Sequence, residues 1–472
     1  MLGTSKRATG RAAIALALFT AALIEFTTDT PNLGPFYGLL GPPGTNTSVT
    51  AGILLILVAT LAMVFGRSAS VEDEGVAFIG PRFERVLRLA PAVALASSLF
   101  WTRRLIPPSH GLLWNAFVVV SAAGFIVLAL ARTPVLTTVA WGIGVGLVIR
   151  IIHFRTFAMD VGADMLPLVR SALASFFQGH SPYALHHVPL PLPLTYYPLT
   201  WLAYAPVAAL GLDLRSVNVI AELAILGALW LVARRTPRAA VCGSATALLW
   251  TTVFVLPSSI YFDRITTAPV AWAAVAWLLA TLSIGSRFAW LALGLALATT
   301  PLTTVFVPIA GLTWFRQWGA KKTLAFLVGA ALVAALIVTP FVVWAPRDFY
   351  EGTVAWFNDL DKFPRTKWKL YRTWRRYIGV SSWLWERGLE QFLKPIQAVL
   401  VLTVAALFTT RGRSQMNGVA MFAAASFLLF MAFNPVLWPY FNQPALVALL
   451  VAVAASERVT PAPAPPAAEF PA

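Results

Sequence analysis

Residues 323–346, TLAFLVGAALVAALIVTPFVVWAP, contain no charged side chain. The hydrocarbon core of a bilayer is about 30 Å thick, and an α-helix needs about 20 mostly apolar residues to cross it, so this stretch is long enough to span. The whole chain has the same character: of 472 residues, 58% are hydrophobic and 11% are charged, whereas about a quarter of the residues in soluble domains are charged. The sequence therefore predicts an all-α, polytopic membrane protein.

About fourteen stretches have the length and composition of membrane spans. They are residues 11–27, 51–66, 86–101, 111–131, 134–152, 216–233, 239–257, 266–284, 288–300, 301–315, 323–346, 391–410, 417–433 and 437–455. The residues from Phe288 to Phe315 are expected to form two short crossings that meet near the sequence ATTPLT, the alternative being one long span.

The spans and the loops between them divide the chain into five parts. These are an N-terminal four-helix membrane segment (1–133), a membrane core with a first large loop (134–346, loop 153–215), a second, basic and aromatic loop (347–390), the C-terminal membrane helices (391–457) and a Pro/Ala-rich tail (458–472) that cannot form a packed core.

Composition also restricts the class of partner. The net charge is +16, but Lys and Arg in cytoplasmic loops are the usual source of such a charge in a membrane protein, so nucleic acid is not an expected partner. Cys242 is the single cysteine, which excludes an intramolecular disulfide framework and a cysteine-based metal site. The basic, apolar N-terminus has no obvious small-residue cleavage site, and we interpret it as a retained first helix.

The positions of Lys and Arg predict the orientation of the spans. Lys6, Arg7 and Arg11 precede the first span, whereas residues 28–50 contain no Lys or Arg. Because short cytoplasmic loops carry an excess of these residues, the first helix should run outward. Counting onward from it places both chain termini in the cytoplasm.

The same count places the first loop (153–215) and the second loop (347–390) on the extracytoplasmic face. It holds only if the apolar segment TYYPLTWLAYAPVAALGL, residues 195–212, does not cross the membrane. We therefore interpret this segment as a re-entrant or membrane-surface helix.

The first loop collects acidic and imidazole side chains. Asp160 and Asp164 are four residues apart and would share a helix face, ahead of an amphipathic pattern typical of a surface helix. Four of the five histidines fall here: His153, His180, His186 and His187. A solvated loop that simply holds polar residues is one interpretation. The other is catalytic, because partial desolvation at a membrane boundary raises the pKa of a carboxylate toward that of a useful general base.

Zinc is not favoured in this loop, since the adjacent His186 and His187 diverge and are poorly placed to bind one metal ion together. No Gly-rich phosphate loop followed by Lys occurs, so no nucleotide site is expected. Within the spans Glu222 is the main ionisable residue. Such a residue is by default a functional candidate, although Glu222 could equally hydrogen-bond Asn218 one turn away.

The second loop contains nine Lys and Arg against six Asp and Glu, interleaved with Trp and Tyr. Arg365, Lys369, Arg372 and Arg376 recur at helical spacing and would share one face. One interpretation is a basic amphipathic helix on anionic lipid headgroups. The other is capture of a lipid phosphate, to which Arg and Lys are suited by charge-assisted hydrogen bonds.

The sequences QGHSPY (178–183) and LTYYPLTWLAYAP (194–206), following an acidic residue and an amphipathic helix, resemble a known pattern. It is that of the polyprenyl-phosphate-sugar-dependent glycosyltransferases of the GT-C superfamily, especially the bacterial mannosyltransferase-like branch. The matching residues are Gly179, Pro182, Tyr183, Tyr197, Pro198 and Leu199, with Tyr-Pro-Leu where the family has Tyr-Pro-Pro. In ATTPLT, Thr stands where the family commonly has a phosphate-contacting Lys.

The resemblance implies an inverting enzyme of the cell envelope, in the inner (plasma) membrane, with an extracytoplasmic active site. A loop aspartate, Asp164 in preference to Asp160, would deprotonate the acceptor hydroxyl of a glycan or glycolipid. The donor would be a polyprenyl-phosphate-linked sugar, with mannose or a pentose as candidates. The candidate donor-binding residues are Arg170, His180, Tyr183, His186, His187, Tyr196, Tyr197, Arg264, Lys369, Arg372, Arg375 and Arg376.

Two questions stay open at the level of sequence. A divalent cation, Mg²⁺ or Mn²⁺, near the donor phosphate is an alternative to metal-free catalysis. A transporter or flippase of lipid-linked sugars or another solute is the alternative function, although transporters often show related halves and none are visible here.

Overall fold

The computed structural model describes residues 81–99, 111–159, 165–188, 190–234, 239–256, 260, 263–356, 384, 387–411, 416–434 and 443–454. The expected spans 11–27 and 51–66 lie outside these residues. So do the candidate site residues Asp160, Asp164, Lys369, Arg372, Arg375 and Arg376.

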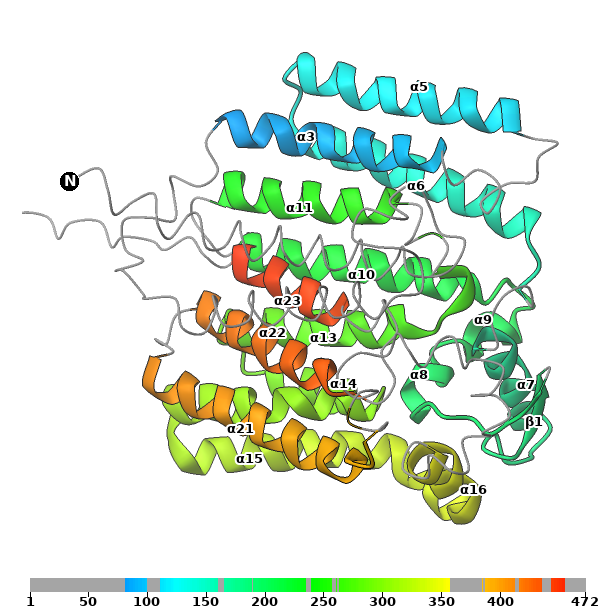
Figure 1. Cartoon of the computed structure of the whole chain (residues 1–472), viewed down its shortest axis with the longest axis vertical. Coiled ribbons are helices and arrows are strands. Elements are labelled where there is room, and N and C mark those ends of the chain that lie inside the picture. The colour runs from blue at the N-terminus through cyan, green and yellow to red at the C-terminus, as the bar shows by residue number, and fades with distance from the viewer. Residues whose placement is uncertain are drawn as a thin grey trace, which may run out of the picture.

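The described part of the chain is mostly helical and membrane-embedded in character. Its longer helices are α3 (Pro81–Ala96), α5 (Gly111–Leu130), α6 (Val135–Thr156), α10 (Arg215–Ala233), α11 (Ala239–Val255), α13 (Ala268–Ser283), α14 (Ala289–Leu297), α15 (Val307–Trp344), α21 (Leu393–Arg411), α22 (Met416–Ala432) and α23 (Gln443–Ala454). They lie side by side with roughly parallel axes (Figure 1). Five helical segments among the described residues are long and apolar enough to cross a membrane: 111–130, 135–156, 215–233, 301–344 and 393–410.

The shorter elements gather at one end of this helical bundle, on the right in Figure 1, which we call the loop end. They are α7 (Met165–Phe177), the antiparallel strands β1 (His186–Val188) and β2 (Leu190–Leu192), α8 (Pro198–Leu202), α9 (Ala205–Ala209) and α16 (Pro346–Tyr350). Residues 195–212 thus form two five-residue helices and no membrane-spanning helix, as expected.

The chain reverses inside the 44-residue apolar segment 301–344. Gly319 has φ 77° and ψ 176°, outside the helical region, and the rings of Trp314 and Phe326 lie 5.5 Å apart. Along one continuous helix these two residues would be separated by about 18 Å. The segment is therefore two antiparallel helices, which correspond to the expected spans 301–315 and 323–346.

A second reversal occurs within ATTPLT, where two short crossings were expected to meet. A Cβ atom on Gly285 would lie 3.9 Å from the side-chain amide of Gln317, so the chain folds back on itself around residues 298–300. The nine residues of α14 rise about 14 Å, which is about half of the bilayer core. Helix α14 is thus a short helix within 288–300, the first of the two stretches where short crossings were expected.

The tip of this second hairpin is held by the first loop. The backbone N–H of Leu199 in α8 donates to the carbonyl oxygen of Ala298 at 3.0 Å, and the Thr200 hydroxyl donates to that of Thr299 at 2.7 Å. Irregular backbone within a membrane protein needs such internal partners. Helix α8 therefore supplies polar contacts that the turn itself cannot.

Helices α6 and α11 approach closely because two glycines of the α6 sequence GIGVG face α11. A Cβ atom on Gly142 would lie 2.1 Å from Thr251, and one on Gly146 would lie 2.6 Å from the ring of Phe254. Small residues four apart permit this close packing between membrane helices. The ring of Phe254 in turn lies 3.9 Å from the guanidinium of Arg150. The close approach of α6 and α11 at these glycines therefore holds this ring against the buried guanidinium.

Candidate functional site

The described parts of the two polar loops pack against each other at the loop end. Phe349, at the start of the second loop, contacts Tyr183 of the first loop with ring centroids 4.8 Å apart. Two residues further on, the one-turn π-helix Glu351–Ala355 begins, and a Cβ atom on Gly352 within it would lie 2.4 Å from the carbonyl oxygen of Leu194. We call this contact the loop junction.

Tyr183, one of the residues that carry the family resemblance, is the centre of the loop junction. Its hydroxyl donates to the carbonyl oxygen of Tyr196 at 2.9 Å and accepts from the Nε1–H of Trp201 at 3.2 Å. The residue is 1% exposed, and burial raises the pKa of its phenol above the ordinary value. Because this neutral hydroxyl already donates one hydrogen bond and accepts another, it holds the loop together and is not positioned for proton transfer.

His186 is also committed to the protein. Its Nε2 lies 2.8 Å from the carbonyl oxygen of Pro182 and its Nδ1 lies 3.0 Å from the hydroxyl of Ser171. Because a carbonyl oxygen only accepts, Nε2 carries a proton, while Nδ1 shares a hydrogen bond with the Ser171 hydroxyl. Both ring nitrogens are thus used to hold the hairpin β1–β2 against α7, and the expected donor-binding role has no free nitrogen in this arrangement.

The other described candidates differ in exposure. Arg170, His180 and His187 are exposed at the loop end, and Tyr196 and Tyr197 are half-buried beside the loop junction. Burial raises the pKa of Tyr197 above its ordinary value. These five side chains are accessible to a ligand, unlike Tyr183 and His186.

Arg264 is buried, and its guanidinium lies over the ring of Phe157 at 4.9 Å. Phe157 stands three residues before Asp160 in the sequence. Arg264 therefore contacts the start of the segment that carries both candidate bases. No group of three or more His, Cys, Asp or Glu side chains suited to a metal ion occurs in the part of the chain that the structure describes.

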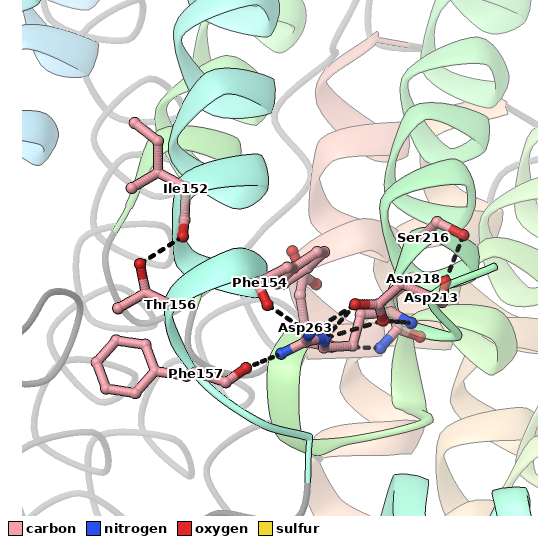
Figure 2. Close-up of polar contacts among 9 residues, drawn as sticks. Ile152, Phe154, Thr156, Phe157, Asp213, Ser216, Asn218 and Asp263 are labelled. Carbon is pink, nitrogen blue, oxygen red and sulfur yellow. Dashed lines mark hydrogen bonds and ion pairs between the residues drawn. The ribbon is translucent and has the colours of Figure 1, made fainter.

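Arg215 fixes the two ends of the first loop to each other. Its Nη1 and Nη2 donate to the carbonyl oxygens of Phe157 and Phe154, each at 2.6 Å, and its Nε donates to Asp213 at 2.9 Å. Figure 2 shows Phe154 and Phe157, at the end of α6, beside Asp213, at the start of α10. We call this contact the neck of the first loop. A cation suits this place because the last carbonyl groups of a helix carry partial negative charge.

Asp213 completes the neck. Its burial alone would raise its pKa, but the hydrogen bonds and charge of Arg215 outweigh that effect and hold the pKa below the ordinary value. The carboxylate also accepts from the backbone N–H of Arg215 at 2.9 Å. The neck is therefore ionised at neutral pH.

The sequence did not reveal a second polar centre, which we call the ion cluster: Arg150, Glu222 and Asp263. Arg150 pairs with Glu222 through Nη2 and with Asp263 through Nε at 2.6 Å. Of the two interpretations of Glu222, the hydrogen bond to Asn218 is not formed, because the Asn218 amide donates to the carbonyl oxygens of Asp263 at 2.6 Å and Thr266 at 2.7 Å. The available signal was Arg150 itself, a cation within the expected span 134–152 that requires an acidic partner.

Comparison with protein-family models, with curated proteins and with solved structures finds no match to this chain. The residues themselves and the contacts between the loops therefore indicate the function.

Proposed function

We propose that this chain is an integral-membrane glycosyltransferase that transfers a sugar, mannose or a pentose, from a polyprenyl phosphate to an extracytoplasmic glycan or glycolipid acceptor with inversion. The observation that carries the proposal is the loop junction, where the described parts of the first and second loops pack against each other at one end of a membrane-embedded bundle. Such an enzyme needs both loops over one site, since a lipid donor arrives from the bilayer while its sugar stays in water.

The distribution of cations supports an extracytoplasmic site. Cations lie beside the helix ends that are opposite the loop end (Figure 1): Arg234 after α10, Arg287 between α13 and α14, and Lys322 at the start of the second half of α15. Such short loops rich in Lys and Arg are typical of the cytoplasmic face. The loop end then faces outward, in the inner (plasma) membrane of a bacterium, where it meets lipid-linked sugars of the cell envelope.

In this proposal Asp164 is the general base and Asp160 its competitor. Asp164 directly precedes Met165 in the sequence, where α7 begins, so a carboxylate there would be stabilised by the helix dipole and would need apolar surroundings to stay basic enough for the reaction. Arg372 and Arg376 of the second loop hold the donor phosphate, where cations stabilise the charge that develops on the leaving group. A divalent cation at the phosphate is an open addition to this arrangement.

The test is transfer of labelled sugar from polyprenyl-phosphate donors by the purified full-length protein in liposomes. Asp164→Asn should reduce turnover by about 10² to 10⁴ because a general base is lost, while donor binding is retained. Arg372→Ala and Arg376→Ala should weaken donor binding instead. Glu351→Gln is the control, because it removes only the exposed carboxylate that pairs with Arg347 at the protein surface.

Two results would change the assignment. An active Asp164→Asn variant beside an inactive Asp160→Asn variant moves the base one helical turn upstream. Full activity of both variants removes these aspartates from the mechanism.

The ion cluster favours a second candidate, a transporter or flippase, because ionisable residues inside membrane helices often mark ion or proton pathways. Liposomes that contain the protein distinguish the two functions. An enzyme transfers sugar without a transmembrane gradient. A transporter moves a lipid-linked sugar or solute across the bilayer, and its rate depends on Glu222 and on an imposed pH gradient.

A further inference from the structure

The ion cluster lies inside the bundle, on three elements that the chain brings together. Arg150 belongs to α6, Glu222 belongs to α10, and Asp263 precedes α13. Their side chains are 1%, 3% and 1% exposed. The remaining guanidinium nitrogen, Nη1, donates to the carbonyl oxygen of Phe254 at 2.6 Å, so all three nitrogens of Arg150 have partners in the protein.

The geometry of the guanidinium brings the two acids close together. Its Nε and Nη2 form one edge, which commonly binds both oxygens of a single carboxylate. Here that edge binds Oδ2 of Asp263 and Oε2 of Glu222. The two carboxyl groups therefore lie side by side on one edge of the same guanidinium. A hydrogen bond between two carboxyl groups needs a proton, because an ionised carboxylate only accepts.

Charge counting leads to the same requirement. With both acids ionised, the three groups carry one positive and two negative charges, a net charge of −1. An uncompensated charge away from water is costly, and the usual outcome is neutralisation by a proton. Two carboxyl groups that share a site commonly retain one proton between them.

The neighbouring polar groups do not supply the missing cation in this arrangement. Among the described residues, Arg150 is the cation that forms ion pairs with Glu222 and Asp263. Arg215 is engaged by Asp213 in the neck, Arg264 lies over Phe157, and the ring of His153 packs on Phe157 at 4.8 Å.

Neutral groups surround the rest of the cluster. Asn218 holds the backbone of Asp263, with Tyr204 donating to the Asn218 side chain. The Nε1–H of Trp250 donates to the backbone carbonyl oxygen of Glu222 at 3.0 Å. Oδ1 of Asp263 is buried with no hydrogen-bond partner among the described residues, as suits an acid that is not fully ionised.

We propose that Glu222 and Asp263 share one proton and, together with Arg150, form a neutral proton-binding site inside the membrane helices, close to the loop end. The proton lies between the two carboxyl groups. Its loss would leave one uncompensated negative charge inside the bundle. This inference does not depend on the glycosyltransferase proposal, and its tests use no measurement of sugar transfer.

The first test is infrared difference spectroscopy of the full-length protein at neutral pH, in water and in D₂O. The wild type should show the C=O band of a buried protonated carboxyl group, with a shift in D₂O. Glu222→Gln and Asp263→Asn should each lose this band, because the one remaining acid is ionised against Arg150. Glu351→Gln should keep it. A wild-type spectrum without the band, or a band that survives both single substitutions, overturns the proposal.

The second test is the thermal stability of the same variants. Glu222→Gln and Asp263→Asn each leave one acid for Arg150 and should lower Tm only slightly. The double variant leaves Arg150 without an acid and should lower Tm by clearly more than the sum of the single effects. If both acids are ionised and another cation balances them, each single variant instead strands a charge. Single losses as large as that of the double variant would therefore refute a shared proton.

Discussion

At the scale of single residues, the neck shows how one side chain can close a long loop. Arg215 binds two carbonyl oxygens at the end of α6 and a carboxylate at the start of α10. Lys could not replace it, because an ammonium group lacks the planar fork that reaches several acceptors at once. The 57 residues between Phe157 and Arg215 thus begin and end at one fixed point.

The neck should be sensitive to acid. Because the folded-state pKa of Asp213 is lowered, its contribution to stability is complete above the unfolded-state pKa of about 3.9 and is lost as the pH falls through the lower, folded-state value. Asp213→Asn keeps an acceptor for the backbone N–H of Arg215 but has no charge. The difference in Tm between wild type and this variant should be largest near neutral pH and should shrink at low pH. A difference that does not change with pH would contradict an ionised neck.

At the scale of elements, the contact between α6 and α11 depends on glycine at particular positions. Gly146→Ala would place a methyl group 2.6 Å from the ring of Phe254, and overpacking of this kind costs about 1–3 kcal/mol. Gly144→Ala is the matched control on the same helix, because a Cβ atom there meets no atom within 4 Å. Thermal unfolding should show a clear loss for Gly146→Ala only. Equal effects at the two positions would mean that helix propensity, and not close packing, determines the result.

The sequence predicts the positions of the helices better than it predicts which side chains contact each other. The apolar runs around 111–131, 134–152 and 391–410 became long helices, because hydropathy over about 20 residues is a local property. The ring contacts of Tyr183 and the pairing of Glu222 with Arg150 join residues far apart in the chain. Such contacts depend on how helices are arranged, which no local pattern records.

At the scale of the whole molecule, the loop junction couples the end of α15 to the first loop. Gly352→Ala would place a methyl group 2.4 Å from the carbonyl oxygen of Leu194, and backbone on both sides leaves little room for adjustment. The second loop should move away from the first, so the proposed sugar transfer should fall strongly while the bundle stays folded. Glu351→Ala, at the exposed neighbouring position, is the control. Unchanged transfer by Gly352→Ala would show that the two loops need not meet for activity.

The hairpin of α14, residues 298–306 and the first arm of α15 also bears on how the chain enters the membrane during synthesis. The two ends of this hairpin lie close together at Gly285 and Gln317. The cations of this region lie at or just beyond these two ends: Arg287, Arg316, Lys321 and Lys322. Residues 288–315 carry no charge. Charged side chains enter hydrocarbon only at high cost. If the hairpin inserts as one unit, with its two ends staying on the side from which it enters, only uncharged residues pass into the lipid. Biogenesis of this region therefore requires no charged residue to be translocated.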